Sequence, residues 1–314
     1  MHRNLRRLWN CVLFALPGGL KPALWLIKLT VPVSLAVFLL DYLGWLFVIS
    51  SAIEPVFRFM GLPGESAFVL ITSIFTNVYS AIGVITTLHI PYREATILGV
   101  MCLISHNFLI ETLVMKKTGS NPWRMVILRL VMSFVAGLVL NLVLPGKNSV
   151  VESAGISEHV PFFEAFLAWG SNMFWMCVKI IILVSMLMIL QKALEEFGII
   201  KKLAPVLRSA MKAMGLAEAV SFSWVVGNAI GLAYGSAIMM EQVQQRKMSL
   251  EEADLMNHHL AVSHSQLEDP LLFVAIGLSA GWMIWPRFIL AVGVVWARRL
   301  ELKIRGKYKT NPRI

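Results

Sequence analysis

Charged residues are scarce in this chain, and their scarcity argues against a soluble domain. Only 15% of the 314 residues are charged, whereas 57% are hydrophobic and the mean hydropathy is +0.72. A soluble domain of this length carries about a quarter charged residues. Four largely apolar stretches are long enough, or nearly so, to cross a hydrocarbon core about 30 Å thick; they lie near residues 24–40, 123–144, 162–190 and 271–296. The sequence therefore predicts an all-α integral membrane protein.

Several chemical motifs are also missing. The three cysteines are widely spaced and form no Cys-x-x-Cys pair, which excludes a disulfide framework and a cysteine metal site of that type. A phosphate-cradling glycine loop is absent, so this chain alone is not expected to drive pumping with nucleotides. No nucleophile–base arrangement or zinc-protease motif is present, and we expect no enzyme. The only expected cofactor is a transported or coupling cation.

The formal net charge of +10 could indicate nucleic-acid binding, but its distribution argues against that partner. The basic residues gather at the ends of apolar segments, which is how cytoplasmic loops are marked in membrane proteins. We therefore predict a multi-pass protein of the cell (inner) membrane, with cytoplasmic N- and C-termini and the lipid bilayer as its partner; a homo-oligomer is left open. The basic residues that support this are Arg3, Arg6, Arg7, Lys116, Lys117, Lys201, Lys202, Arg246, Lys247, Arg298 and Arg299.

The chain divides into two similar halves. Met60-Gly61-Leu62 recurs as residues 214–216, and Glu94-Ala95 recurs as residues 252–253, in the same order. A tandem duplication explains this best. The expected organisation is a cytoplasmic segment, a first membrane repeat, an external linker, a second repeat and a basic cytoplasmic tail, with bounds 1–22, 23–146, 147–160, 161–298 and 299–314.

Each half is predicted to contain five elements in the same order. A long apolar helix is followed by an amphipathic interfacial helix, an interrupted apolar stretch, a helix that carries a histidine and an acid, and a second long helix. The interrupted stretches, near 65–89 and 218–241, contain polar residues and glycines and could be single spans or re-entrant hairpins. We favour hairpins. Either choice gives an odd number of crossings per half, so the second repeat is predicted to be inverted.

A polar cluster occurs once in each half. Residues 105–111 read Ser-His-Asn-Phe-Leu-Ile-Glu, and residues 263–269, which begin 158 positions later, read Ser-His-Ser-Gln-Leu-Glu-Asp. Ionisable groups at membrane depth are costly and functional by default, and matching interruptions in two halves point to a transport site. The residues expected along the solute or ion pathway are Asn77, Tyr79, His106, Asn107, Glu111, Asn228, Tyr234, Asn257, His264, Gln266, Glu268 and Asp269.

These clusters contain metal-ligating groups. His264 and Glu268 are four residues apart, which places them on one face of a continuous helix, with Asn257 two turns earlier. Such a pair could coordinate a borderline divalent metal, relay a proton, or only join two helices through a hydrogen bond. The expected metal ligands are His106, Glu111, His264 and Glu268. His258 and His259 are expected near the aqueous end of their helix, and Arg287 is expected as an inward anchor or a snorkelling residue.

Several segments of the second half are similar to a known family. Residues 190–198 (Leu-Gln-Lys-Ala-Leu-Glu-Glu-Phe-Gly), the amphipathic helix with residues 214–216, and residues 227–231 (Gly-Asn-Ala-Ile-Gly) resemble the nucleoside-recognition, or Gate, domain family. That domain occurs in concentrative nucleoside transporters, in the membrane part of the ferrous-iron transport protein B, and in spore maturation proteins A and B. The resemblance implies an inverted-repeat transporter core with helical hairpins. The chain lacks the GTPase domain of the iron transporter and its Gly-Cys-x-Val-Pro-like segment.

Three functions follow as hypotheses. The first is a transporter or permease for a small solute or ion, with a divalent metal of the ferrous-iron type favoured because of the ligand-type groups. The second is a nucleoside transporter, which the aromatic and amide groups near the interrupted stretches leave open. The third is a non-transporting membrane scaffold or assembly factor.

Overall fold

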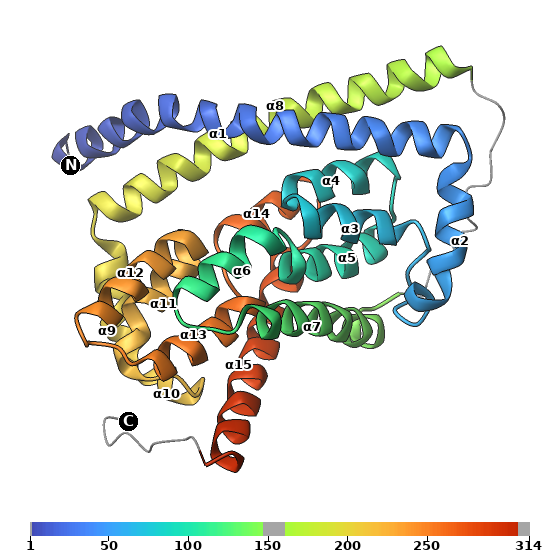
Figure 1. Cartoon of the computed structure of the whole chain (residues 1–314). Helices are drawn as coiled ribbons and strands as arrows, with labels where there is room; N and C mark the ends of the chain where they lie inside the picture. Colours follow the sequence, from blue (N-terminus) through green and yellow to red (C-terminus); the bar gives the residue numbers. More distant parts are fainter. Residues whose placement is uncertain (1, 147–160, 307–314) are drawn as a thin grey trace.

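The computed structural model describes residues 2–146 and 161–306, and the described chain is helical throughout (Figure 1). The all-α fold class is therefore confirmed. The predicted linker 147–160 and the last part of the predicted tail, residues 307–314, lie outside the described residues.

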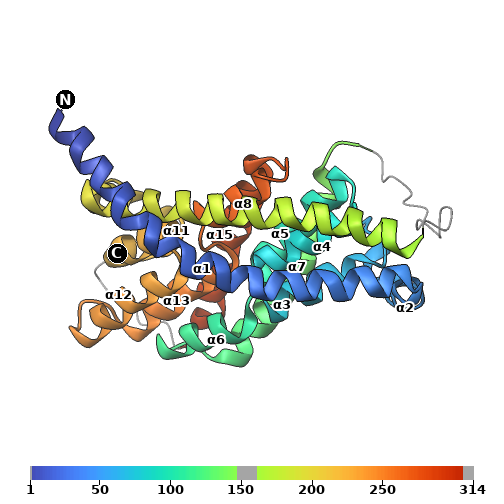
Figure 2. The ribbon, with the colours of Figure 1, turned by 90° about the horizontal axis from the view of Figure 1, so that it is seen from above.

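Two long helices lie side by side across one face of the molecule (Figures 1 and 2). They are α1 (His2–Tyr42) and α8 (Phe162–Glu196), the first elements of the two predicted halves. α1 begins at His2, so it already contains most of the segment that we expected to precede the first repeat. The rest of the bundle packs beneath this helix pair.

The second elements are short helices, α2 (Trp45–Arg58) in the first half and α9 (Ile199–Val206) with α10 (Arg208–Ala213) in the second. The single helix expected over 199–214 is therefore divided at Leu207. Pro205 lies inside α9, two residues before this division, and a proline lacks the backbone N–H that donates to the preceding turn of a helix.

The third elements are helical hairpins, as predicted in outline. They consist of α3 (Ser66–Phe75) with α4 (Val78–Thr87), and of the short 3-10 helix η1 (Glu218–Val220) followed by α11 (Ser221–Ala229) and α12 (Leu232–Gln244). The first hairpin turns at Asn77, whose side chain caps α4 by accepting a hydrogen bond from the Ser80 amide at 3.0 Å. The second turns at Gly231, with a φ of 119° that side chains rarely adopt. Re-entry of the hairpins into the bilayer stays a prediction.

The fourth elements are broken, and our expectation of one continuous helix in each half is wrong. The first half has α5 (Tyr92–Ser105) and α6 (Phe108–Lys117), and the second half has α13 (Leu250–Val262) and α14 (Glu268–Val274). Each break falls at the predicted histidine.

The last elements are α7 (Pro122–Val143) and α15 (Ala280–Ile304). α15 begins later than the apolar stretch expected near 271–296, because α14 takes the first part of that stretch. By length and composition four described helices could span a membrane, and the bent α5–α6 pair would make a fifth. This agrees with a multi-pass membrane protein, while the inversion of the two halves stays a prediction.

Candidate cation site

The two helix breaks bring a histidine from each half into contact. His106 follows α5 and His264 follows α13, and their Nε2 atoms lie 3.4 Å apart. Both residues are buried, with 6% and 1% of their surface exposed. The two halves of the chain therefore meet at a pair of imidazoles.

Backbone carbonyls fix which nitrogen of each ring carries the proton. His106 Nδ1 lies 3.1 Å from the Cys102 carbonyl, and His264 Nδ1 lies 2.8 Å from the Leu260 carbonyl. Because a carbonyl oxygen can only accept, each Nδ1 must donate, and in a neutral ring Nε2 then carries a lone pair. Two lone pairs face each other across 3.4 Å, which is an unfavourable contact unless a cation or a proton lies between them.

A carboxylate completes the cluster. Glu111 Oε1 lies 3.0 Å from His106 Nε2 and 3.3 Å from His264 Nε2, so the three atoms form a nearly equilateral triangle. Four ligands around a metal with bonds of about 2.05 Å lie about 3.3 Å apart in a tetrahedral site. These three groups could therefore hold a metal ion with little movement.

Asp269 is the counterpart of Glu111 in the second half and lies next to this triangle. Its Oδ2 atom is 3.6 Å from His106 Nε2, is buried, and has no hydrogen-bond partner among the described residues. A buried carboxylate oxygen without a partner is costly unless a cation neutralises it. Asp269 thus lies beside the site, but outside the group of three residues whose ligand atoms all lie within 4.8 Å of one another.

Two fully buried arginines hold the broken helix ends. Arg129 donates to the carbonyls of Ile104 and His106 at 2.8 and 2.5 Å. In the second half, 158 positions later, Arg287 donates to the carbonyls of residues 262 and 264 at 3.2 and 2.6 Å. Backbone groups freed by a broken helix need such partners away from water. Arg129 also pairs with Glu111 at 2.7 Å, so it orients this carboxylate as well.

The hairpins hold the breaks from the other side. The Asn107 amide donates to the Ser73 carbonyl on α3 at 2.9 Å, and the Ser265 amide donates to the Gly227 carbonyl on α11 at 3.1 Å. Asn107 and Ser265 both have left-handed backbone conformations, with φ of 51° and 47°. The two breaks therefore make equivalent backbone hydrogen bonds beside their histidines, although their sequences differ.

Glu268 lies outside the triangle, and the helical spacing that paired it with His264 is wrong. α13 ends at Val262 and α14 begins at Glu268, so no continuous helix carries both groups. Glu268 instead accepts a hydrogen bond from Gln191 of α8 at 3.3 Å. Tyr79 is half-buried and within electrostatic reach of Glu268 and Asp269.

The remaining predicted pathway residues are dispersed. Asn77 caps α4, and Asn228 donates to the Trp224 carbonyl at 3.0 Å within α11. Gln266 bonds to Ser263 at the second break. Tyr234 is 60% exposed on α12 and is not in the cluster.

Three polar residues of α13 are buried away from the two central histidines. Asn257 donates to Thr118 and Ser120 at 2.8 and 2.9 Å, which joins the halves away from the histidines. His258 and His259 are buried, with 3% and 0% exposed, so their expected aqueous position is wrong. They are enclosed because α13 packs against α5, α7 and α15.

Sequence reasoning missed Arg129 and Gln191. Arg129 is an ionisable residue inside an apolar helix and lies 158 positions before Arg287, at the same offset as the two histidines. That offset was the available signal. Gln191 belongs to the segment 190–198 that resembles the Gate family, but nothing in that segment indicates its hydrogen bond to Glu268.

The helices and the buried polar cluster define a multi-pass membrane protein with two similarly built halves. Residues 23–121 match the family model described as Nucleoside recognition (Gate), which confirms the resemblance to that family. The Gate-like character of the second half stays a prediction.

The chain is also similar to a bacterial membrane protein. It is 27% identical over 301 residues, covering 95% of each chain, to a protein of Bacillus subtilis (strain 168) named Uncharacterized membrane protein YvoD. No solved structure matches. The family match supports a transporter-like role, and the relative supports a place in a membrane.

Proposed function

We propose that this protein carries a divalent transition-metal cation across the membrane and binds it between its two halves. One observation carries the proposal: the carbonyls of Cys102 and Leu260 hold both histidines with their Nε2 lone pairs directed at a common point, which Glu111 also faces. Metal-ligating histidines usually donate their other ring N–H in this way.

The ligand set favours one class of ion. Two imidazoles and a carboxylate suit borderline ions such as Fe²⁺, Zn²⁺, Co²⁺ or Ni²⁺, whereas Mg²⁺ and Ca²⁺ prefer oxygen ligands. The duplicated arrangement around His106 and His264 also supports transport, because solute sites of repeat-built transporters lie where the repeats meet. We further propose that the protein resides in the cell inner membrane with both termini cytoplasmic.

Equilibrium binding of each ion to the detergent-purified protein tests the site. We expect one tight site for Zn²⁺ or Co²⁺ per chain, and at least a 10- to 100-fold weaker affinity in His106→Ala and in His264→Ala. His258→Ala is the matched control, because it also removes a buried histidine and should leave the affinity unchanged. Equal affinity in all four proteins would overturn the site.

Flux into proteoliposomes tests transport itself, with divalent metals and nucleosides as solutes. Metal uptake that fails in His264→Ala, at equal amounts of folded protein, is the expected result. Nucleoside uptake instead would favour a nucleoside transporter. Metal binding with no flux of any solute would favour a scaffold that holds a structural metal.

A further inference from the structure

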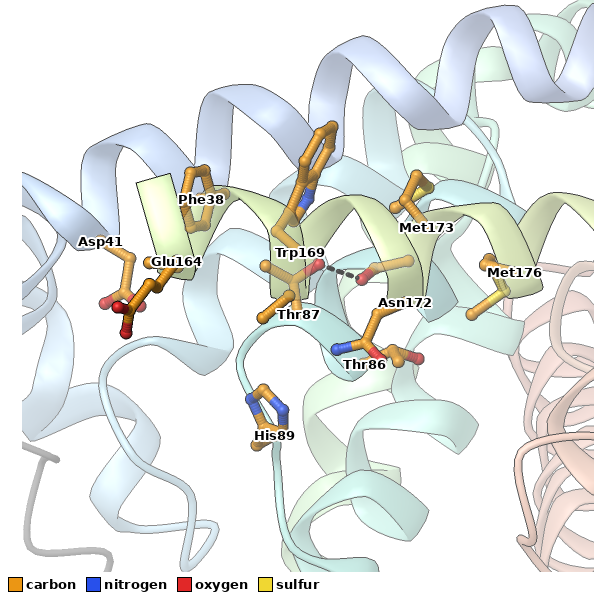
Figure 3. A pocket seen from close by; sticks show the side chains of 13 residues that line it. Phe38, Asp41, Thr86, Thr87, His89, Glu164, Trp169, Asn172, Met173 and Met176 are labelled. Atoms are coloured by element: carbon orange, nitrogen blue, oxygen red, sulfur yellow. Dashed lines mark hydrogen bonds between the residues drawn. The ribbon is translucent and has the colours of Figure 1, made fainter. Parts of the chain in front are cut away.

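A cavity of about 330 Å³ lies between α1, α4 and α8, apart from the cation cluster (Figure 3). Its walls include Phe38 of α1, Thr86 of α4 and Trp169 of α8. It is here called the α1/α4/α8 cavity. Glu164 of α8, which lines this cavity, lies four residues after the segment 147–160, which charge distribution predicts to be external.

Two carboxylates mark one end of this cavity. Asp41 of α1 and Glu164 of α8 point to the same end in Figure 3, and both are exposed. Among the described residues no lysine or arginine forms an ion pair with either carboxylate; His89 is the basic side chain that also lines the space. Clefts lined by one sign of charge and bounded by apolar walls concentrate the opposite ion. This mouth therefore attracts cations.

The opposite end of the cavity adjoins a second, smaller space. Met173 and Met176 lie there, and Met176 also lines a second space of about 10 Å³, beside Tyr79 and Ile180. That volume is at or below what one water molecule needs. The walls of this constriction are mostly apolar, as in hydrophobic gates that close a pore; Lys179, which is exposed, is the one charged residue among the described residues that line it.

Beyond the constriction the polar groups resume. Tyr79 lies within electrostatic reach of Asp269, whose unpartnered oxygen is 3.6 Å from His106 Nε2. A series of residues thus connects the acidic mouth to the metal-type ligands: Met176, Tyr79, Asp269 and His106.

Hydrogen bonds hold the cavity wall in place. The Trp169 indole donates to the Ser34 hydroxyl at 3.1 Å, and Ser34 bonds to Thr87 at 2.8 Å, which links α8, α1 and α4. The Phe38 and Trp169 rings stack with centroids 5.7 Å apart. These contacts fix α1, α4 and α8 relative to one another around the cavity.

We propose that the α1/α4/α8 cavity is the vestibule through which a divalent cation enters from the predicted external side. Asp41 and Glu164 collect the ion, and the constriction at Met176 and Tyr79 separates the vestibule from the buried site. This rests on the proposed function, because it assigns a route to the same cation.

Charge-selective labelling of one cysteine tests the vestibule without any transport assay. Thr86→Cys is introduced together with Cys177→Ser, since Cys177 is half-buried and Cys11 and Cys102 are buried. A cationic methanethiosulfonate reagent should modify Cys at position 86 about tenfold or more faster than an anionic one. Adding Asp41→Asn and Glu164→Gln should remove this preference.

A control cysteine replaces Ser51, which lines a surface hollow where Glu54 and Arg58 have opposite charges. This position should show little preference between the two reagents. Equal rates of both reagents at position 86, or an unchanged preference in the neutralised variant, would overturn the vestibule.

The rate at which a metal ion binds to the cluster tests the route. Protein whose cysteine at position 86 carries the cationic reagent should bind Co²⁺ at least about tenfold more slowly. Its equilibrium affinity should be unchanged, because the metal ligands are intact. Charge-selective labelling without slower metal arrival would overturn the route while leaving the metal site standing. Absence of any metal binding, with His106→Ala indistinguishable from the unmodified protein, would instead overturn the proposed function.

Discussion

His106 and His264 each stand at the end of a broken helix, and their environment decides their chemistry. Each Nδ1 is committed to a carbonyl of its own helix, four residues earlier. Each Nε2 atom therefore faces the other half of the chain. Histidine can serve as metal ligand, proton relay or structural hydrogen-bond partner. The paired lone pairs favour the first of these roles.

Among single residues of the site, the negative charge of Glu111 is the feature to test. Glu111→Gln keeps the shape but replaces one carboxylate oxygen by an amide, so affinity for Co²⁺ or Zn²⁺ should fall at least about tenfold. Titration calorimetry measures the change. Glu268→Gln is the control, because Glu268 bonds to Gln191 outside the triangle, and its effect should be much smaller. A larger loss in Glu268→Gln would contradict the assignment.

Arg129 is predicted to be a structural requirement of the site. Its replacement by methionine leaves Glu111 buried without its cation and frees two carbonyls, at Ile104 and His106. Breaking a buried ion pair costs about 3–5 kcal/mol, so the melting temperature in detergent should fall markedly. Arg124→Met removes a partly exposed pair with Glu301 and should cost about 1 kcal/mol or less. Equal losses in the two variants would contradict this role.

Among the elements, the second hairpin depends on close backbone contact. Gly227, Gly231 and Gly235 recur every fourth residue, and a Cβ at Gly235 would lie 2.6 Å from the Gly227 Cα. Only a residue without a side chain allows α11 and α12 to approach this closely. The same α11 supplies the carbonyl that holds the break at Ser265.

Gly235→Ala should therefore loosen both the hairpin and the site. Overpacking of this kind costs about 1–3 kcal/mol, so thermal unfolding in detergent should occur at a lower temperature and metal affinity should weaken. Gly170→Ala on α8 is the control, because a Cβ there meets nothing within 4 Å. An unfolding temperature that is the same in Gly235→Ala as in the unmodified protein would contradict the role of this close backbone contact.

The constriction next to the vestibule gives a second prediction for an element. Met176→Ala removes a buried side chain that lines both spaces, so Co²⁺ should reach the cluster faster while its equilibrium affinity stays the same. Stopped-flow measurement of binding checks the rate. Met186→Ala on the exposed face of α8 should leave the rate unchanged. A slower rate in Met176→Ala would contradict a gate at this position.

Across the whole molecule, the sequence predicted the order of elements better than their continuity. Hydrophobic length gave the long helices, and glycine and polar interruptions gave the hairpins. The breaks at His106 and His264 were missed, because neither proline nor glycine marks them; they are held by Arg129, Arg287 and the hairpins, which are distant in sequence. Tertiary partners of that kind override local helical spacing.

The sequence predicted which residues belong to the site, but not which of them contact one another. His106, Glu111 and His264 were identified from their types and their repetition. Spacing along one helix paired His264 with Glu268, whereas the fold pairs it with Glu111 of the other half. Contacts across the 158-residue offset depend on how the halves dock, which no local pattern encodes.

The central claim is that one metal ion is shared by the two halves, and X-ray absorption of the Zn²⁺- or Co²⁺-loaded protein tests it most directly. We predict two imidazole nitrogens per metal at about 2.0–2.1 Å. This number should fall to one in His106→Ala and also in His264→Ala. A spectrum without imidazole ligands, or one that neither substitution changes, would contradict the account.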